Sequence, residues 1–314
     1  MKDYCFGIDI GGTTVKCGLF RTNGDLVDKW EIPTRTEEAG KNILPDIAAA
    51  VKAKMSEKNL TTDDVEGVGV GVPGPVRHGR VPVAVNLHWG ETDIVGILGG
   101  LTGLHVCAGN DANVAALGEM WKGGAEGCSD VIVVTLGTGV GGGIIVDGKL
   151  VEGSHGAGGE IGHGHVTDEL TEPCNCGNTG CLEQVASATG IVRVAKDELT
   201  KHPEVKTALK DDGGLSAKAV FDAYKTGDDL AEIIVNRFAK YLGSMLGAYA
   251  CVTDPEIIVI GGGVSKAGEP LIDIVTRYYK EYAFSACKNT PIVLARLGND
   301  AGIYGSAKLV LTKS

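Results

Sequence analysis

The same order of elements is predicted twice along this chain. Residues 4–10 form an apolar strand that leads through a glycine turn into a second strand over residues 15–20. Residues 130–136 form another apolar strand, which leads through the glycine turn 137–139 into a strand over residues 142–146. Each half continues with a hairpin, a third strand, and then helices alternating with strands. This repeat predicts a duplicated α/β fold with a cleft between its two domains.

The length of 314 residues also favours two domains over one. We place the smaller domain at residues 1–109 plus about 298–314, and the larger one at residues 110–297. Asn23-Gly24 predicts a type I′ hairpin turn. Hydrophobic periodicity predicts further strands over 26–32, 67–72, 105–108, 150–152, 257–260 and 292–295, and helices over 38–58, 93–101, 184–200, 216–225, 229–252, 270–282 and 300–311, with another helix starting near 111.

Charge and hydropathy exclude several classes of protein. The net charge of -11 and the pI of about 5.1 argue against a nucleic-acid partner, because binding phosphates requires a basic surface. Membrane binding is not expected, since no apolar run reaches the roughly 18 residues that a spanning helix needs. The first residues enter a strand directly and do not resemble a signal peptide. We therefore expect a cytoplasmic protein.

Three cysteines and one histidine lie close together in the sequence. They are His163, Cys174, Cys176 and Cys181. In a chain without a secretion signal, such a cluster favours a metal site over disulfides. Four protein ligands leave no open coordination position, so we expect a structural Zn²⁺; buried thiols without a metal are the alternative. The other six cysteines, Cys5, Cys17, Cys107, Cys128, Cys251 and Cys287, are expected to be small buried hydrophobic residues.

The glycine-rich stretch 137–142 matches the G-x-G-x-x-G pattern of dinucleotide-binding folds. That motif requires a helix to follow, whereas residues 144–149 predict a strand and a hairpin turn. The overlapping P-loop pattern also fails, because Leu150 stands where Ser or Thr would hold magnesium. What remains is a turn whose backbone N–H groups and Thr138 hydroxyl can bind phosphate. The matching turn after Asp9 strengthens this interpretation.

Several polar residues near these turns allow more than one interpretation. Asp9 could cap its turn or lie near magnesium, and Lys16 could face phosphate or solvent. Asp111 could be the N-cap of a helix, or a general base that takes a proton from an attacking hydroxyl. Asn110 could bind a neighbouring hydroxyl with both its donor and its acceptor.

The motifs, taken together and in order, resemble those of the ROK family (repressors, open reading frames, kinases). Within that family the chain is most similar to the bacterial ATP-dependent glucokinases, and the resemblance covers nearly the whole chain. The segments that carry it are Asp9–Lys16, Gly71–Pro75, Asn86–Trp89, Asn110–Asn113, Leu136–Gly139, Gly159–His163, Cys174–Glu183 and Ile258–Gly263.

The resemblance implies an actin-like, hexokinase-type fold and ATP-dependent phosphorylation of glucose at its 6-hydroxyl. Asp111 matches the catalytic base of the family, and the cofactors implied are ATP with Mg²⁺. Positions matching sugar-binding residues are Gly74, Asn86, Asn110, Asp111, Glu160, His163 and Glu183. Positions matching or adjoining nucleotide- and phosphate-binding residues are Asp9, Gly11, Gly12, Thr13, Thr14, Lys16, Gly137, Thr138, Gly139, Gly262 and Gly263. The family also suggests a homodimer or a tetramer.

The metal loop then becomes one wall of the sugar pocket. His163 can bind Zn²⁺ with one ring nitrogen and turn the other toward a sugar hydroxyl. Glu160 and Glu183 flank the ligands, so the metal would orient both carboxylates without contacting them.

Other members of the family suggest competing functions. The repressors carry an additional N-terminal helix-turn-helix, for which a first strand starting at Tyr4 leaves no room, and the chain is acidic. Kinases of N-acetylmannosamine or N-acetylglucosamine would share the hydroxyl-binding residues and differ in the room near C2 of the sugar. Polyphosphate is another phosphoryl donor to consider, although no long basic track is evident.

Overall fold

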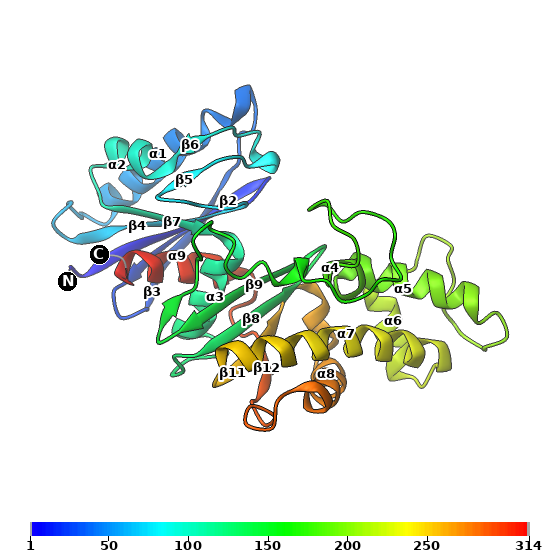
Figure 1. The fold of residues 1–314 in the computed structure, drawn as a ribbon. Coiled ribbons are helices and arrows are strands. Elements are labelled where there is room, and N and C mark those ends of the chain that lie inside the picture. The colour runs from blue at the N-terminus through cyan, green and yellow to red at the C-terminus, as the bar shows by residue number, and fades with distance from the viewer. Residues whose placement is uncertain (1, 313–314) are drawn as a thin grey trace. The chain divides into compact units, whose positions relative to one another are not determined.

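The computed structural model describes residues 2–312, and these form two compact units (Figure 1). The first unit contains the residues up to Gly127, the segment Gly143–Gly159 and the residues from Arg296 onward. The second unit contains Cys128–Gly142 and Glu160–Ala295. Segments from both ends of the chain therefore build the first unit, and β1 lies beside the C-terminal helix α9 in Figure 1.

The first sheet has the strand order β3-β2-β1-β4-β7. Its first three strands are antiparallel neighbours, whereas β4 and β7 run parallel to β1. This arrangement brings the C-terminal ends of β1, β4 and β7 to one edge of the sheet. The strands are β1 (Tyr4–Ile10), β2 (Thr14–Arg21), β3 (Leu26–Pro33), β4 (Val65–Val72) and β7 (Val106–Asn110).

Alternation of valine and glycine in β4 explains how this sheet is covered. Val68, Val70 and Val72 belong to one buried core cluster, together with residues of α1 (Ile43–Glu57) and α2 (Ile94–Thr102). Because successive side chains of a strand point to opposite faces, the glycines between these valines face the other way. There, a Cβ on Gly69 would lie 1.7 Å from the carbonyl oxygen of Ser306 in α9 (Ala301–Thr312). Glycine therefore lets the backbone of α9 touch the sheet.

Helix α3 (Asp111–Lys122) packs on α9 within the first unit. The two helices approach closely because glycine stands at their contacts. A Cβ on Gly118 would lie 2.3 Å from the carbonyl oxygen of Ala301. A Cβ on Gly305 would lie 1.4 Å from the carbonyl oxygen of Val114. This packing fixes the position of α3, whose first residue is Asp111.

The second sheet repeats the strand order of the first. Its order is β10-β9-β8-β11-β12, with β8, β11 and β12 parallel and with β9 antiparallel to β10. The predicted duplication of an α/β architecture is therefore confirmed. The strands are β8 (Val131–Leu136), β9 (Val140–Val146), β10 (Lys149–Leu150), β11 (Ile257–Gly261) and β12 (Ile292–Leu294). A separate small sheet pairs β5 (Arg80–Val81) with β6 (Thr92–Asp93).

The helices of the second unit follow the predicted ranges with one correction. The single helix expected over residues 184–200 is interrupted at Ser187, whose ψ of 172 is extended. The hydroxyl of Ser187 accepts the backbone N–H of Gly190, so this residue caps a second helix instead of continuing the first. The helices are α4 (Glu183–Ala186), α5 (Ala188–Lys201), α6 (Ala217–Lys225), α7 (Asp229–Thr253) and α8 (Glu269–Tyr282).

Two smaller predictions were wrong. A type I′ turn requires positive φ at two consecutive residues, but at the β2–β3 hairpin only Gly24 has it, with φ 100. The N–H of Gly24 donates to the carbonyl of Arg21, and a register shift follows at Leu19 and Phe20, as in a bulged hairpin. The helix predicted over 38–58 is a short 3-10 turn, Glu38–Gly40, followed by α1.

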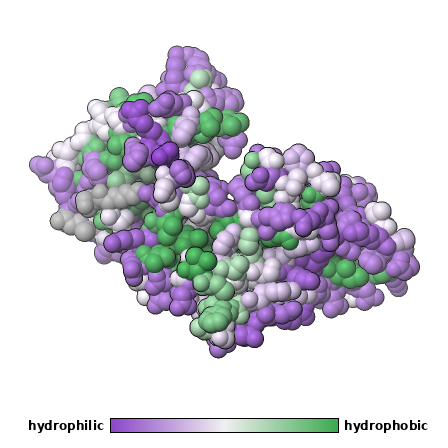
Figure 2. Space-filling view, viewed as in Figure 1, coloured by the Kyte–Doolittle hydropathy of each residue, from purple (hydrophilic) through white to green (hydrophobic). Residues whose placement is uncertain are grey.

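The two compact units and the predicted domains divide the chain differently. Residues 110–127 and 143–159 belong to the first unit, whereas the sequence analysis placed them in the larger domain. A compact unit is defined by contacts and a domain by independent folding, so the predicted domain bounds stay a prediction. Residues 1, 313 and 314 lie outside the described part of the chain. No helix within residues 2–312 is long and apolar enough to cross a membrane. Most of the surface in Figure 2 is hydrophilic, with the hydrophobic residues in separate areas.

Candidate functional site

Asp9 is the last residue but one of β1, at the edge of the first sheet where the glycine turn begins. Burial raises the pKa of its carboxyl group to about 6; the charge of Lys16 lowers this pKa and the charge of Asp111 raises it. Helix α9 covers this side chain, because a Cβ on Gly302 would lie 2.5 Å from the Asp9 carboxyl carbon. Two carboxylates, Asp9 and Asp111, thus interact electrostatically within the first unit.

Lys16 is half-buried beside the first glycine turn, and its contact with phosphate stays a prediction. It lies opposite Asp9 on β2, and its Nζ donates to the backbone carbonyl of Asn299 at 3.0 Å. The turn between these strands is closed by the N–H of Gly11, which donates to the carbonyl of Thr14 at 3.0 Å. Gly12 and Thr13 at its tip are exposed to solvent, where their backbone can receive a ligand.

The N-cap of α3 is Asn110, not Asp111. The Asn110 side-chain oxygen accepts the backbone N–H groups of Ala112 at 3.0 Å and Asn113 at 3.2 Å. Asp111 is the first helical residue and is exposed, and its Oδ1 accepts the N–H of Ala112 at 2.8 Å. The positive end of the helix dipole favours the charged form of a carboxylate at this position. The helix therefore has a cap that does not depend on Asp111.

Two further predicted sugar-binding residues lie near this turn and this helix start. The Asn110 amide nitrogen donates to the carbonyl of Gly74 at 3.1 Å, and Gly74 has the positive φ of 113 that favours glycine. One Asn110 hydrogen is therefore already used, and its oxygen caps the helix, so only the second amide hydrogen is left for a ligand. A Cβ on Gly12 would lie 3.7 Å from the carbonyl oxygen of Asn86, which places Asn86 beside the first glycine turn.

The second glycine turn, Gly137–Gly139, is fixed to the start of α5. The N–H of Ala188 donates to the carbonyl of Gly137 at 2.8 Å, and the Thr189 hydroxyl donates to the carbonyl of Thr138 at 2.7 Å. These two hydrogen bonds hold the turn against the start of α5. Sequence reasoning missed Ala188 and Thr189, because it expected this segment to lie inside a continuous helix.

The glycines after β11 lie next to the same turn. Gly262 has φ 84 and ψ -177, a conformation that is essentially restricted to glycine. A Cβ on Gly262 would lie 2.5 Å from the carbonyl oxygen of Leu136, the residue before Gly137. The structure therefore brings together two of the predicted nucleotide-binding segments, and it does so within one unit.

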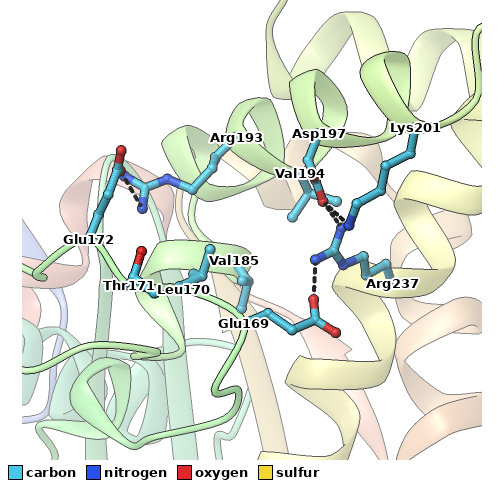
Figure 3. A pocket seen from close by; sticks show the side chains of 10 residues that line it. All are labelled: Glu169, Leu170, Thr171, Glu172, Val185, Arg193, Val194, Asp197, Lys201 and Arg237. Atoms are coloured by element: carbon cyan, nitrogen blue, oxygen red, sulfur yellow. Dashed lines mark hydrogen bonds and ion pairs between the residues drawn. The ribbon is translucent and has the colours of Figure 1, made fainter.

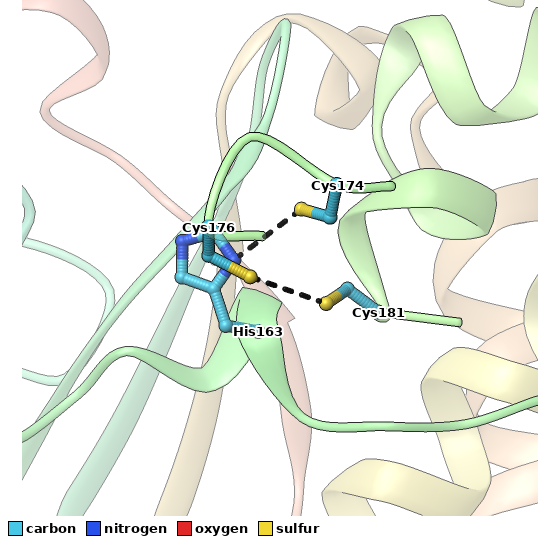
Figure 4. A group of neighbouring side chains, drawn as sticks. All are labelled: His163, Cys174, Cys176 and Cys181. Atoms are coloured by element: carbon cyan, nitrogen blue, oxygen red, sulfur yellow. Dashed lines mark hydrogen bonds between the residues drawn. The ribbon is translucent and has the colours of Figure 1, made fainter. Parts of the chain in front are cut away.

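The four predicted metal ligands form a cluster (Figure 4). The ligand atoms of His163, Cys174, Cys176 and Cys181 all lie within 4.8 Å of one another. Nδ1 of His163 is 3.7 Å from Sγ of Cys174, and Sγ of Cys176 is 3.6 Å from Sγ of Cys181. In a tetrahedron with Zn–S bonds of about 2.3 Å, sulfurs lie about 3.8 Å apart. The donor types and their spacing therefore fit a closed tetrahedral zinc site.

Both predicted carboxylates contact this cluster. Oε1 of Glu183 accepts a hydrogen bond from Sγ of Cys174 at 3.0 Å, and its Oε2 accepts the N–H of Val140 at 3.4 Å. Oε2 of Glu160 lies 3.8 Å from Nε2 of His163, the ring nitrogen on the side away from Cys174. The two nitrogens of His163 therefore face a candidate metal ligand and a carboxylate, and contact of Nε2 with a sugar hydroxyl stays a prediction.

Buried Gln184 joins the two arms of the metal loop. Its side-chain oxygen accepts the N–H of Cys181 at 3.0 Å, and its amide nitrogen donates to the carbonyl of Glu172 at 2.9 Å. Arg193 on α5 lies 3.5 Å from the carboxylate of the same Glu172. These contacts hold the loop closed on both sides of Cys174.

A pocket beneath the stem of the metal loop contains a network of ion pairs (Figure 3). Arg237 on α7 donates to Glu169 in the loop stem and to Glu198 on α5, each at 2.6 Å, and it also pairs with Asp197. Lys201 pairs with Asp197 at 2.8 Å. The guanidinium group thus connects the stem to two helices, and this network is a support for the loop.

A more apolar pocket lies beside Gly263. Its lining includes Ala188, Ala217 and Phe221 with the stem of Lys218, besides Val264 and Ala267. The sequence analysis assigned nothing to α6, because an amphipathic helix of ordinary composition gives no sign of a ligand.

Of the scattered cysteines, the structure contradicts the expectation of burial for Cys251, which is exposed, and Cys128 is half-buried.

Comparison with known proteins shows the family. The ROK family model matches residues 5–313. The chain belongs to the ROK family. A glucokinase from Halalkalibacterium halodurans is 45% identical over 97% of this chain and 94% of its own length. An N-acetylmannosamine kinase from Escherichia fergusonii is 32% identical over 96% of both chains.

The fold agrees with that of solved ROK structures. A ROK glucokinase from Streptomyces griseus, solved in complex with glucose and AMPPNP, is 34% identical and covers 98% of this chain and 99% of its own, with a TM-score of 0.74. The expectation of an actin-like, hexokinase-type ROK fold is confirmed. The resemblance stated from the motifs is thus correct for nearly the whole chain.

Proposed function

We propose that this protein is a glucokinase that transfers the γ-phosphoryl group of ATP to the 6-hydroxyl of glucose. The observation that carries the proposal is the 45% identity to a curated glucokinase over 97% of the chain. It is supported by a helix start at which Asn110 makes the cap and Asp111 presents an exposed carboxylate. It is further supported by two glycine turns at equivalent places of the repeat.

Asp111 is the general base in this proposal. It accepts the proton of the glucose 6-hydroxyl while that oxygen attacks the γ-phosphorus. The bond between the γ-phosphorus and the β–γ bridging oxygen breaks, and ADP leaves with the bonding electron pair. Positioned general bases typically contribute about 10²–10⁴ in rate, and phosphoryl transfer depends otherwise on alignment and on neutralising charge.

The two glycine turns are proposed to bind the phosphates. Backbone N–H groups at Gly12, Thr13, Thr138 and Gly139 can donate to phosphate oxygens without changing their conformation. Asp9 carries a carboxylate oxygen of the kind that Mg²⁺ prefers, and it stands at the end of β1 beside the first turn. Mg²⁺ carried by ATP would neutralise charge on the phosphates.

The apolar pocket beside Gly263 suits the base of the nucleotide. The aliphatic stem of Lys218 and the edge of buried Phe221 offer apolar contacts to a purine, and Gly262–Gly263 allow close approach of a ligand to the backbone. Ala188 lines this pocket and also holds Gly137, so base and phosphate sites are linked through one residue.

Glu160, His163 and Glu183 are proposed to bind sugar hydroxyls, with Asn110 contributing its second amide hydrogen. A Zn²⁺ ion would be held by Nδ1 of His163 and the sulfurs of Cys174, Cys176 and Cys181. When bound, it would supply structural cross-linking, with no open position for chemistry. His163 then keeps Nε2 on the side of Glu160, which fixes how these two side chains are presented to a sugar.

The second candidate is an amino-sugar kinase, because N-acetylmannosamine kinases are also relatives over nearly the full length. An assay that couples ADP formation to a colour change, run over glucose, mannose, fructose, N-acetylmannosamine and N-acetylglucosamine, separates the two. We expect the highest kcat/KM for glucose with ATP as donor. A higher kcat/KM for an N-acetyl sugar would refute the glucose assignment and leave the kinase assignment standing.

A further inference from the structure

The four predicted metal ligands differ in exposure. Cys174 and Cys181 are buried, at 7% and 0% exposed, whereas Cys176 is exposed to solvent. Figure 4 shows that the sulfur of Cys174 points to His163 and that the sulfur of Cys176 points to Cys181. Only one of the three cysteines is therefore exposed to a reagent in solution, and its sulfur lies 3.6 Å from that of Cys181.

The backbone between these two cysteines brings their sulfurs together. Gly177 and Gly180 have φ values of 92 and 68, which bend the segment back on itself. The two sulfurs lie 3.6 Å apart although the two cysteines are five positions apart in sequence. A disulfide requires an S–S distance of about 2.05 Å, so the two sulfurs must approach each other by about 1.5 Å.

We propose that Cys176 is a site of oxidation by hydroperoxides, and that the oxidised residue forms a disulfide with Cys181. This inference rests on the zinc site and the sugar-binding role proposed above. The Cys176 thiolate attacks a peroxide oxygen, which gives a sulfenic acid and releases hydroxide or an alkoxide. The Cys181 thiolate then attacks the sulfenic sulfur and displaces hydroxide. Two thiolates lose two electrons in total, and the peroxide gains them.

Formation of this disulfide removes two of the four metal ligands. Because His163 and Cys174 alone hold Zn²⁺ weakly, the ion leaves. His163 and Cys174 are then no longer held in place by the metal. Glu160, which contacts His163, and Glu183, which contacts Cys174, therefore lose a partner in a fixed position. Oxidation of the exposed cysteine thereby lowers sugar affinity, and reduction in the presence of Zn²⁺ restores it.

The test uses the full-length protein after its zinc content has been measured. The protein is treated with hydrogen peroxide, released zinc is followed with a chromogenic chelator, and disulfides are mapped by mass spectrometry after alkylation of the remaining thiols. We expect one zinc released for each disulfide, a dominant Cys176–Cys181 bond, and a rise in the KM for glucose of at least ten-fold. Dithiothreitol with Zn²⁺ should reverse all three changes.

Cys251→Ser is the matched control, because Cys251 is exposed but lies outside the cluster. This variant should keep basal activity and still release zinc and form the same disulfide. A dominant disulfide involving Cys174, oxidation confined to Cys251, or conversion of Cys176 to a sulfinic acid without a disulfide would each overturn the proposal. Absence of zinc before oxidation would refute only the proposed zinc site. The disulfide map would still test whether Cys176 pairs with Cys181. Loss of zinc with an unchanged KM for glucose would refute the link to the sugar.

Discussion

Oε1 of Glu183 lies 3.0 Å from Sγ of Cys174, while the other oxygen of the same carboxylate accepts the N–H of Val140. Glu183 therefore connects the metal cluster to the residue that follows the glycine turn Gly137–Gly139. A Cβ on Gly139 would lie 2.5 Å from Oε2 of Glu183, so glycine is needed there for this contact. A change at the metal ligands is transmitted directly to a residue proposed to bind the sugar.

Removal of zinc should therefore weaken sugar binding and not only stability. We expect a chelator-treated protein that has been verified as zinc-free to show a KM for glucose at least ten-fold higher, since loss of partners that orient a site typically costs 10–100-fold. The KM for ATP should change less, because the contacts of Ala188 and Thr189 with the glycine turn do not involve the metal ligands. Circular dichroism confirms that the chain is folded, and an unchanged KM for glucose would contradict this prediction.

Asp111→Asn should strongly reduce turnover and leave the fold intact. The variant keeps the size of the side chain but cannot accept the proton of the 6-hydroxyl, so kcat should fall by about 10²–10⁴. The helix keeps its cap from Asn110, and we expect the melting temperature to stay within a few degrees of the original. Rates in the coupled assay and glucose binding by calorimetry should show that kcat falls while affinity is retained. Activity within a factor of two of the original would exclude Asp111 as the base.

Asp9→Asn should change how stability depends on pH. Burial raises the folded-state pKa of Asp9 to about 6 from an ordinary value of 3.8, so the folded protein holds this proton more tightly than the unfolded chain does. The resulting stabilisation is present below pH 3.8 and is lost as the pH rises through about 6. Relative to the original protein, the variant should therefore gain up to about 3 kcal/mol in unfolding free energy between pH 4 and pH 7.5.

Urea denaturation of both proteins at several pH values measures this difference. The variant should also lose most of its activity with ATP and Mg²⁺ at every pH. A stability difference that is the same at pH 4 and pH 7.5 would show that Asp9 has an ordinary pKa in the folded state.

Gly262→Ala should be far more damaging than Gly268→Ala. Both glycines have a positive φ and an extended ψ, so alanine is strained by about 1–3 kcal/mol at either position. Only at Gly262 does a new Cβ meet an atom, the carbonyl oxygen of Leu136 at 2.5 Å. We expect a lower melting temperature for both variants and a raised KM for ATP for Gly262→Ala alone. Equal effects of the two changes on the KM for ATP would contradict the proposed nucleotide contact.

The strands and the cluster of candidate metal ligands could be predicted well from the sequence, because their patterns are local. Alternating valine and glycine in β4 and the apolar runs of β8 and β11 specify strands by themselves, and the metal ligands are recognisable from residue type and spacing. The hairpin at Gly24 was assigned to the wrong turn type, because the same Asn-Gly pair also suits a bulged hairpin. The helix break at Ser187 was missed, because a capping serine is recognised only once its hydroxyl is seen to accept the N–H of Gly190.

By itself, the sequence determined that this chain is a duplicated α/β protein of the ROK family with a cluster of four candidate metal ligands, because those properties depend on periodicity and on residue type. The tertiary structure decided which side chains contact each other. Asn110 rather than Asp111 caps α3, Lys16 donates to the carbonyl of Asn299, and the exposed Cys176 faces the buried Cys181. The pairing of Lys16 with Asn299 joins residues distant in sequence, so no local pattern encodes it. The other two join residues within five positions, but the backbone conformation decides which donor reaches which acceptor and which sulfur faces which.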